Sequence, residues 1–286
     1  MFATFGRTWN ITKICWQILQ KDRELILFPI FSFIALAVLA VLVMGIGGAS
    51  GAFGRIDTEA AGAGLAGGDV LLAFVSYFAL SFIVIYFNTA LVGAAMIRIR
   101  GGDPTVRDGL AVANSRLPQI LGWSVISGTV GLILRLLREQ AGDNMFGQII
   151  ISIVGGVWAY LTFFVVPTIV VEGVGPIEAI KRSSSLLKRT WGEQVVSNFG
   201  FGLLFIGAAI VGILPALVIA QISPMAGIAV GVLTVGLAAA LVASLEGIFK
   251  AALYEYAAEN VVADEFSAEL LRGSYQTRGG GFRRGF

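Results

Sequence analysis

Six long apolar segments, separated by short polar stretches, dominate the pattern of this chain. They cover residues 25–46, 70–97, 119–137, 147–171, 195–222 and 225–250. Most reach or exceed the roughly 17–25 apolar residues with which an α-helix crosses a bilayer, and the longest can cross with tilt. Such runs satisfy their backbone hydrogen bonds in lipid as helices. The pattern predicts an all-α polytopic membrane protein with six transmembrane helices, arranged as three hairpins.

Three polar segments have a helical period of their own. Residues 3–22, 104–117 and 176–191 each place apolar residues on one face and Lys or Arg on the other. The expected apolar faces are Phe5, Trp9, Thr12, Trp16 and Leu19 in the first, Val106, Leu110, Ala113 and Leu117 in the second, and Ile177, Ile180, Ser184, Leu187 and Trp191 in the third. Helices of this kind lie in the membrane interface. The alternative for the first is a soluble amphipathic helix that docks on a partner.

The cations of these segments are candidate contacts to lipid headgroups: Lys13, Arg107, Lys181, Arg182, Lys188 and Arg189. The chain is therefore expected to comprise an interfacial helix at residues 1–24, a six-span domain at 25–258 and a tail at 259–286. The sixth helix is expected to continue out of the membrane through Tyr254, Glu255, Tyr256 and Glu259.

Proline and small residues predict details within the spans. Pro167 is expected to kink the fourth segment near its exit, and Pro215 lies inside the fifth. Small residues four apart let helices approach closely in lipid; the pairs are Ser124 with Gly128, Ser127 with Gly131, and Gly227 with Gly231. Gly62, Gly64 and Gly67 have GxGxxG spacing, but between two spans they indicate a linker rather than a dinucleotide site.

The distribution of positive charge predicts an orientation. Seventeen Lys and Arg residues belong to the N-terminal segment, residues 98–118 and 172–194 and the tail from Lys250, against three on the opposite side. Cytoplasmic loops carry the excess of Lys and Arg. Both termini are therefore expected in the cytoplasm, and the expected location is the cell inner membrane.

Composition removes several kinds of chemistry. The chain has no histidine and one cysteine, Cys15, so that an internal disulfide or a multi-cysteine metal site is excluded. Ser185 and Lys188 have SxxK spacing, but the other motifs of the acyl-transfer enzymes that use it are absent. We expect no enzymatic activity and no cofactor. The basic, glycine-rich end, residues 278–286, is interpreted as a solvated tail, and no nucleic-acid partner is expected.

Three polar residues within or near the spans are candidate functional residues: Asn88, Glu246 and Lys250. Ionisable side chains at bilayer depth commonly mark functional sites. Glu246 and Lys250, however, are one helical turn apart and can form an ion pair. The favoured interpretation is a structural pair, with Asn88 as an interhelical hydrogen-bonding residue.

Four strings carry a resemblance to a known family: LQKDRELILFPIFS at 19–32, IRGGDPTVRDGL at 99–110, TFFVVPTIVVEGVGPIEAIKRSS at 162–184 and GIFKAALYEYA at 247–257. With them the chain resembles, from about residue 9 to 271, an uncharacterised family of prokaryotic six-helix membrane proteins. The resemblance implies a six-span inner-membrane protein and supplies no catalytic residues. The alternation of spans and basic helices also looks like the membrane domains attached to some glycerophosphodiesterases, an architectural analogy.

Two functional hypotheses remain open at this point. The first is a non-catalytic membrane helper or scaffold that binds membrane lipids, other membrane proteins or a second copy of itself through small-residue helix faces. The second is a small permease or channel for a solute or ion, with a path near Asn88 and Glu246. Repeated units and interrupted helices favour transport, whereas the scarcity of polar residues in the spans favours the helper.

Overall fold

Every regular element in the described part of this computed structural model is a helix, which confirms the all-α prediction for that part. The structure describes residues 2–51, 67–191 and 201–259. Its elements are α1 (Phe2–Lys21), the short 3₁₀ helix η1 (Arg23–Ile26), α2 (Leu27–Ala49), α4 (Gly67–Ile99), α5 (Val106–Ser115), α6 (Leu117–Ala141), α7 (Met145–Thr162), α8 (Val165–Glu172), α9 (Pro176–Trp191), α10 (Phe201–Ala220) and α11 (Pro224–Glu259). The GxGxxG linker and the basic tail lie outside the described residues, apart from Gly67 at the start of α4.

Five helical stretches are long and apolar enough to cross a membrane: Arg23–Ala49, Leu71–Ile99, Leu117–Ala141, Met145–Glu172 and Pro224–Glu259. Helices of this length and composition belong to a membrane protein. Within the expected fifth span, residues 195–222, the structure describes the apolar helix α10, and Phe205–Ala220 forms a shorter apolar helical stretch. In place of the six expected spans, the described residues contain five helices of spanning length and one shorter apolar helix.

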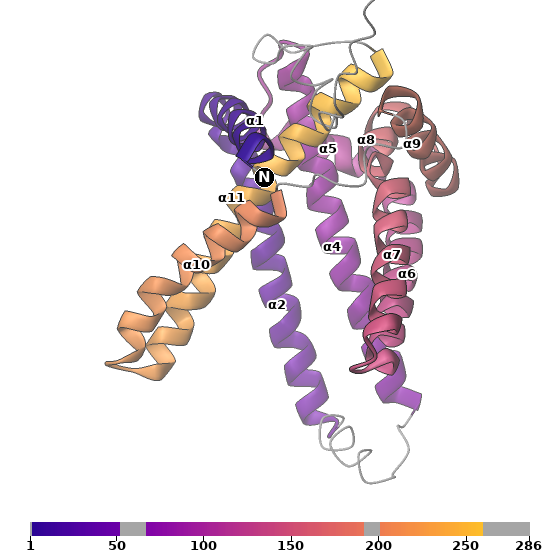
Figure 1. Cartoon of the computed structure of the whole chain (residues 1–286). Helices are drawn as coiled ribbons and strands as arrows, with labels where there is room; N and C mark the ends of the chain where they lie inside the picture. Colours follow the sequence, from indigo (N-terminus) through magenta and orange to yellow (C-terminus); the bar gives the residue numbers. More distant parts are fainter. Residues whose placement is uncertain (1, 52–66, 192–200, 260–286) are drawn as a thin grey trace, which may run out of the picture.

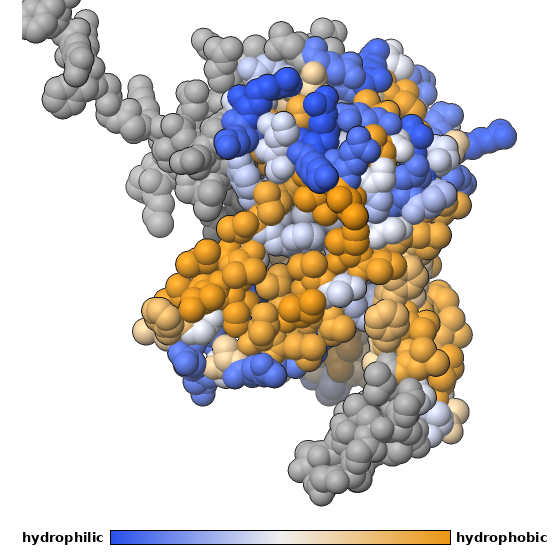
Figure 2. All heavy atoms as spheres, turned by 90° about the vertical axis from the view of Figure 1, so that its right-hand side faces the viewer, coloured by the Kyte–Doolittle hydropathy of each residue, from blue (hydrophilic) through white to orange (hydrophobic). Residues whose placement is uncertain are grey.

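The helices meet at one end of the molecule and separate towards the other. Figure 1 shows α1, α5, α9 and the end of α11 together at the top, while α2, α4, α6 and α7 run downwards. The pair α10 and α11 extends away from them to the lower left. Figure 2 shows hydrophilic residues gathered over the top and hydrophobic residues below. We call the top the polar end and the lower part the apolar end.

Glycine lets α10 and α11 pack closely, as the Gly227 and Gly231 spacing predicts. A Cβ atom at Gly227 would lie 2.6 Å from Cβ of Ala220, and one at Gly231 would lie 3.1 Å from Cβ of Ala216. The backbones can therefore approach only because these positions carry no side chain. The close helix contact predicted at Gly128 and Gly131 is also present, because both glycines of α6 lie against Tyr77 of α4.

The fourth apolar segment is broken, but earlier than Pro167 itself. α7 ends at Thr162 and α8 begins at Val165, with Phe164 at a non-helical φ of −100° and ψ of 11°. A proline has no N–H, and its ring collides with the carbonyl of the residue four positions earlier. For Pro167 that residue is Phe163, which is where the helix stops.

The last part of α11 is buried in protein. Tyr254, Glu255 and Tyr256 are all buried, and Tyr254 is among the largest fully buried side chains. The helix does continue to Glu259, as expected. Its end is covered because α1, α8 and α9 pack around it. The main hydrophobic cluster lies here, at the polar end, and includes Phe28, Phe164 and Ile248.

The buried face of α5 includes the predicted Ala113, whereas the buried faces of α1 and α9 overlap the predicted ones only in part, with Leu19 and Leu187 common to both. In α9 the buried residues are Ala179, Ser183, Leu186 and Leu187, whereas Ile177 is 64% exposed. In α1 the buried residues include Cys15, Ile18 and Leu19, and Trp16 is exposed. The prediction chose the most hydrophobic face, which suits lipid. The structure docks each helix on neighbouring helices, where small side chains allow closer contact.

Candidate functional site

The structure separates the polar candidates of the spans. Glu246 and Lys250 form the ion pair that their spacing predicts, with 2.7 Å between Oε1 and Nζ. The Lys250 ammonium also lies 5.6 Å from the centre of the Phe163 ring, a favourable cation–π arrangement. Asn88 instead lines a cavity whose walls include neither Glu246 nor Lys250. The path near Asn88 and Glu246 is therefore not one site among the described residues.

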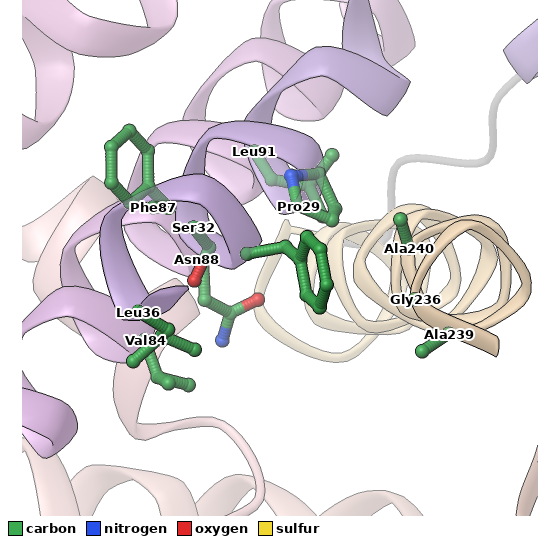
Figure 3. A pocket seen from close by; sticks show the side chains of 11 residues that line it. Pro29, Ser32, Leu36, Val84, Phe87, Asn88, Leu91, Gly236, Ala239 and Ala240 are labelled. Carbon is green, nitrogen blue, oxygen red and sulfur yellow. The ribbon is translucent and has the colours of Figure 1, made fainter. Parts of the chain in front are cut away.

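The cavity at Asn88 lies where α2, α4 and α11 meet, and its volume is about 200 Å³. Its lining is Pro29, Ser32, Phe33 and Leu36 from α2, Val84, Phe87, Asn88 and Leu91 from α4, and Gly236, Ala239 and Ala240 from α11. Figure 3 shows the Asn88 amide extending from the α4 ribbon into the open space beside α11. The small side chains of α11 leave this space unfilled.

Asn88 does not form the interhelical hydrogen bond that the sequence predicts. Its half-buried amide makes no hydrogen bond to any described residue, and neither does the Ser32 hydroxyl. By contrast, Thr89, the next residue of α4, donates to the carbonyl of Ile85 at 2.7 Å. An amide has two N–H donors and one oxygen acceptor. Asn88 therefore brings unused hydrogen-bonding capacity into an apolar cavity.

A second arrangement of polar residues, which the sequence did not single out, lies at the polar end. Three carboxylates, each bound by an arginine, form what we call the polar layer: Asp22 with Arg98, Glu255 with Arg100, and Glu172 with Arg182. The partners of each pair are separated in the sequence. In each pair the carboxylate is less exposed than the arginine that binds it, and a buried carboxylate persists where a cation and hydrogen bonds satisfy it.

The first pair connects the start of the chain to the end of α4. Arg98 donates through two nitrogens to the two carboxylate oxygens of Asp22, which is buried, and also to Asp103 at 2.7 Å. Nearby, Glu24 of η1 accepts a hydrogen bond of 2.7 Å from the backbone N–H of Val106. That N–H opens α5, where a helix favours negative charge. These contacts hold α5 against η1 and α4.

The second pair places a carboxylate of α11 deep in protein. Arg100 lies 2.9 Å from Oε1 of Glu255, whose side chain is 0% exposed, and 3.3 Å from Glu259. Oε2 of Glu255 has no hydrogen-bond partner in the described part of the chain. The hydrogen bond to Glu255 raises the pKa of Arg100 above its usual value, so that the cation is secured.

The third pair fixes α9. Two donors meet at Oε1 of Glu172, the last residue of α8: Arg182 Nε at 2.8 Å and the Tyr254 hydroxyl at 2.9 Å. The hydrogen bond to Glu172 raises the pKa of Arg182. In addition, Ser183 accepts a hydrogen bond from the backbone N–H of Phe164, beside the helix break. Three helices, α8, α9 and α11, are thus joined at one carboxylate.

Arginine and glutamine side chains satisfy carbonyls at the helix ends. Arg116 donates to the carbonyl of Val170, and Gln119 donates to that of Gly173 at 3.0 Å. Arg189 of α9 donates to the carbonyl of Ala257 at 3.0 Å. The last carbonyls of a helix lack partners within it. These side chains replace water at helix ends that are enclosed by protein.

The six headgroup candidates divide into two groups. Arg182 and Arg189 bind Glu172 and Ala257 of the protein itself. Lys13, Arg107, Lys181 and Lys188 are exposed, and neither Lys181 nor Lys188 has an ion-pair partner among the described residues. Sequence reasoning missed Asp22, Glu172 and Glu255. The one signal for them is that each is an acid near the boundary of an apolar run.

The described residues contain no group of three or more His, Cys, Asp or Glu side chains that could hold a metal ion. Cys15 is fully buried, and this burial raises the pKa of its thiol, which makes the reactive thiolate scarce. The carboxylates of the polar layer are occupied by arginine. The arrangement can therefore position helices and present a hydrogen-bonding group to a cavity.

Comparison with known proteins identifies the family. A family of unknown function (DUF6159) matches residues 67–263, which is more than half of the chain. The chain belongs to this family, in agreement with the resemblance to an uncharacterised family of membrane proteins. No curated protein and no solved structure matches.

Proposed function

We propose that this member of the family is a non-catalytic scaffold of the cell inner membrane, which binds anionic lipid and membrane partners. One observation carries the proposal. Hydrogen bonds at Glu24, Glu172 and Ala257 fix α5 and α9 onto neighbouring helices. Arg107, Lys181 and Lys188 of these two helices are exposed. A binding surface that keeps its shape loses less entropy when it binds.

The distribution of polar side chains also favours a scaffold over a permease. The Glu246 and Lys250 pair neutralises itself, and the cavity at Asn88 is lined by no charged residue. Transporters place their substrate and ion sites near the bilayer midplane, on interrupted helices that meet there. The helix break at Phe163 and Phe164 lies instead beside the polar layer, where Ser183 and Tyr254 contact it.

Lys181 and Lys188 supply the lipid-binding part of the proposal. They are one pair of cations on the exposed side of α9, seven residues apart, and so lie on the same face two turns from each other. Lysines near the membrane surface attract anionic lipids, each by about 1 kcal/mol. The fixed position of α9 keeps both at one depth.

The test is lipid retention by the purified chain in nanodiscs that contain zwitterionic and anionic phospholipid. Lys181→Gln with Lys188→Gln should lower the number of anionic lipids retained, measured by native mass spectrometry. Ser185→Ala, an exposed neutral change between them, is the matched control. Retention that is equal in all three proteins would reject the lipid-binding role. A proton- or sodium-coupled current in proteoliposomes, lost in Glu246→Gln, would support the permease instead.

The proposal includes six spans as three hairpins with both termini in the cytoplasm. The seventeen-to-three distribution of Lys and Arg supports this orientation. Single cysteines at Asp143 and Lys188, in a Cys15→Ala background, should react oppositely with a membrane-impermeant thiol reagent added to intact cells. Labelling is expected at position 143 alone. Labelling of both positions from outside would exclude the proposed topology.

A further inference from the structure

We propose that the cavity between α2, α4 and α11 binds a neutral, lipid-soluble carbonyl compound of the quinone type, held by the amide of Asn88 and the hydroxyl of Ser32. The site would add a ligand to a protein otherwise interpreted as a scaffold. Four features of the cavity favour such a ligand: its depth in the membrane, its unpaired hydrogen-bond donors, its lack of charge and its shape.

Depth comes first. Asn88 lies eleven residues before Ile99, the end of α4, and at 1.5 Å per residue this is a distance of roughly 16 Å. The hydrocarbon core of a bilayer is about 30 Å thick. With the polar layer at the membrane surface, Asn88 lies near the bilayer centre. The ester and phosphate groups of phospholipids do not reach this depth, so that a ligand here must itself dissolve in hydrocarbon.

The cavity also contains two side chains with unused hydrogen-bond donors. The Asn88 amide and the Ser32 hydroxyl line the same cavity from neighbouring helices and make no hydrogen bond to the described protein. In hydrocarbon no solvent replaces the missing partner. Both side chains can donate, the amide twice and the hydroxyl once. The complementary group is an oxygen acceptor such as a carbonyl, and an acyl chain alone leaves both donors unpaired.

The lining of the cavity is uncharged and partly aromatic. No charged residue lines the cavity, so that a charged ligand would lack compensation for lost hydration. Phe33 and Phe87 supply aromatic walls, against which a flat ring packs well. The volume of about 200 Å³ is below the roughly 300–1,000 Å³ of pockets that enclose a whole drug-sized ligand. It suits one ring, with an attached chain left in the surrounding lipid.

The opening beside α11 depends on small residues. Gly236 lies against the Phe33 ring, where a Cβ would be 2.8 Å from Cζ, and so brings α11 and α2 together at one edge of the cavity. Ala239 and Ala240 then face the remaining space. A larger side chain at Ala239 would fill it without touching the hydrogen-bonding groups, which separates the effect of shape from that of polarity.

The experiment uses the full chain in nanodiscs, titrated with a decyl-substituted 1,4-benzoquinone, and with decylbenzene as the oxygen-free probe. Binding is measured by native mass spectrometry and by the rise in unfolding temperature. The wild type should bind the quinone saturably and decylbenzene more weakly. Asn88→Leu should weaken quinone binding about tenfold, as the loss of a buried hydrogen bond implies. Ala239→Leu should abolish it, and Ser81→Ala, which faces Gly128 of α6, should leave it unchanged.

Infrared difference spectra provide a second measurement that does not depend on affinity. The carbonyl band of the bound quinone should shift to lower frequency in the wild type and in Ser81→Ala, and should stay at its hydrocarbon position in Asn88→Leu. The proposal is overturned if the wild type shows no saturable quinone binding, if decylbenzene binds equally well, or if Asn88→Leu binds with unchanged affinity and an unchanged band. A cavity that holds only water or an acyl chain gives the first of these results.

Discussion

Two ion pairs with the same length have very different surroundings in this protein. At the polar end, Arg100 lies 2.9 Å from Glu255, whose side chain is 0% exposed. At the far end of α6, Arg135 lies 2.9 Å from Glu139, and the two side chains are 68% and 58% exposed. Exposed pairs contribute little because water and salt screen them, whereas a buried charge depends on its partner. The comparison shows that distance alone does not reveal which charges hold the fold.

The apolar end is held together by a different means. Large hydrophobic side chains such as Leu42, Val218 and Ile228 are exposed there, and lipid must cover them. Burial of apolar surface gives no drive between helices that lipid already surrounds. Close contact of backbones at Gly227 and Gly231 gives van der Waals attraction instead. Charge pairs thus help to join the helices at the polar end, whereas close contacts at glycine join α10 and α11 at the apolar end.

The largest expected effect is at Arg100. Arg100→Leu leaves the buried Glu255 carboxylate without its cation and should destabilise the protein by about 3 kcal/mol. This is the lower part of the range for such losses, because Arg100 itself is partly exposed. Arg135→Leu should change stability by less than about 0.5 kcal/mol. Unfolding in mixed micelles of increasing SDS fraction measures both.

The double variant Arg100→Leu with Glu255→Leu separates charge from packing. It should recover most of the lost stability, since no unpaired charge remains. Equal destabilisation by Arg100→Leu and Arg135→Leu would contradict the distinction between the two ends.

The next effect concerns the contact of α10 and α11. Gly227→Ala places a Cβ 2.6 Å from that of Ala220 and 2.8 Å from its backbone nitrogen, so the helices must move apart. We expect a loss of about 1–2 kcal/mol from overpacking. The matched variant is Gly207→Ala in α10, where nothing lies within 4 Å, and where alanine should be neutral or stabilise the helix. The same SDS titration gives the comparison, and equal signs for the two variants would refute it.

A smaller effect is expected at Tyr254. Tyr254→Phe removes one hydrogen-bond donor to Glu172, while the donor Arg182 remains. The free energy of unfolding should fall by about 1.5 kcal/mol, the low end for a hydrogen bond to a charged group. Tyr86→Phe is the control, because its hydroxyl donates to Asn114 in an exposed position; its cost should be about 0.5 kcal/mol or less. Thermal unfolding of the purified variants measures the difference. A larger loss for Tyr86→Phe would show that Glu172 does not need its second donor.

The smallest effect concerns the first turn of α5. Thr105 and Asp108 form a capping box, and the hydrogen bonds from Thr105 lower the pKa of Asp108. A carboxylate whose pKa is lower in the folded than in the unfolded protein stabilises the fold at any pH above its unfolded pKa. This stabilisation is lost as the pH falls through the folded pKa. Amide exchange in α5 should therefore be slower in the wild type than in Asp108→Asn at pH 7. The two should converge at low pH, and a difference that persists there would exclude the carboxylate as the cause.

The elements of the fold were predictable because their signals are local. Run length gave the apolar helices, and Pro167 gave the break within four residues of its position. The buried faces of α1 and α9 were predictable only in part. Hydrophobicity ranks Ile177 above Ala179, yet Ala179 is buried and Ile177 is exposed.

The two arrangements of the site depend on contacts that sequence does not encode locally. Arg98 and Asp22 are 76 positions apart, and Arg100 and Glu255 are 155 apart. Each looks like an ordinary charge at a span boundary until the helices are placed. Asn88 was recognisable as an unusual polar residue. Its lack of a partner follows from Gly236, Ala239 and Ala240 on the facing helix, which leave a space where an interhelical contact was expected.

The length of α11 has a mechanical consequence. Its 36 residues form one helix about 54 Å long, clamped near Glu255 by the polar layer and joined to α10 at the other extremity. Along its length α11 also packs on Phe33 of α2 at Gly236. The portion before Gly236 measures roughly 18 Å, so a rotation of about 5° at that contact displaces the turn between α10 and α11 by about 1.6 Å. The first three turns of α11 and the helix α10 thus form an arm that pivots where Gly236 meets Phe33, and a small repacking at that contact becomes a displacement of the turn between α10 and α11.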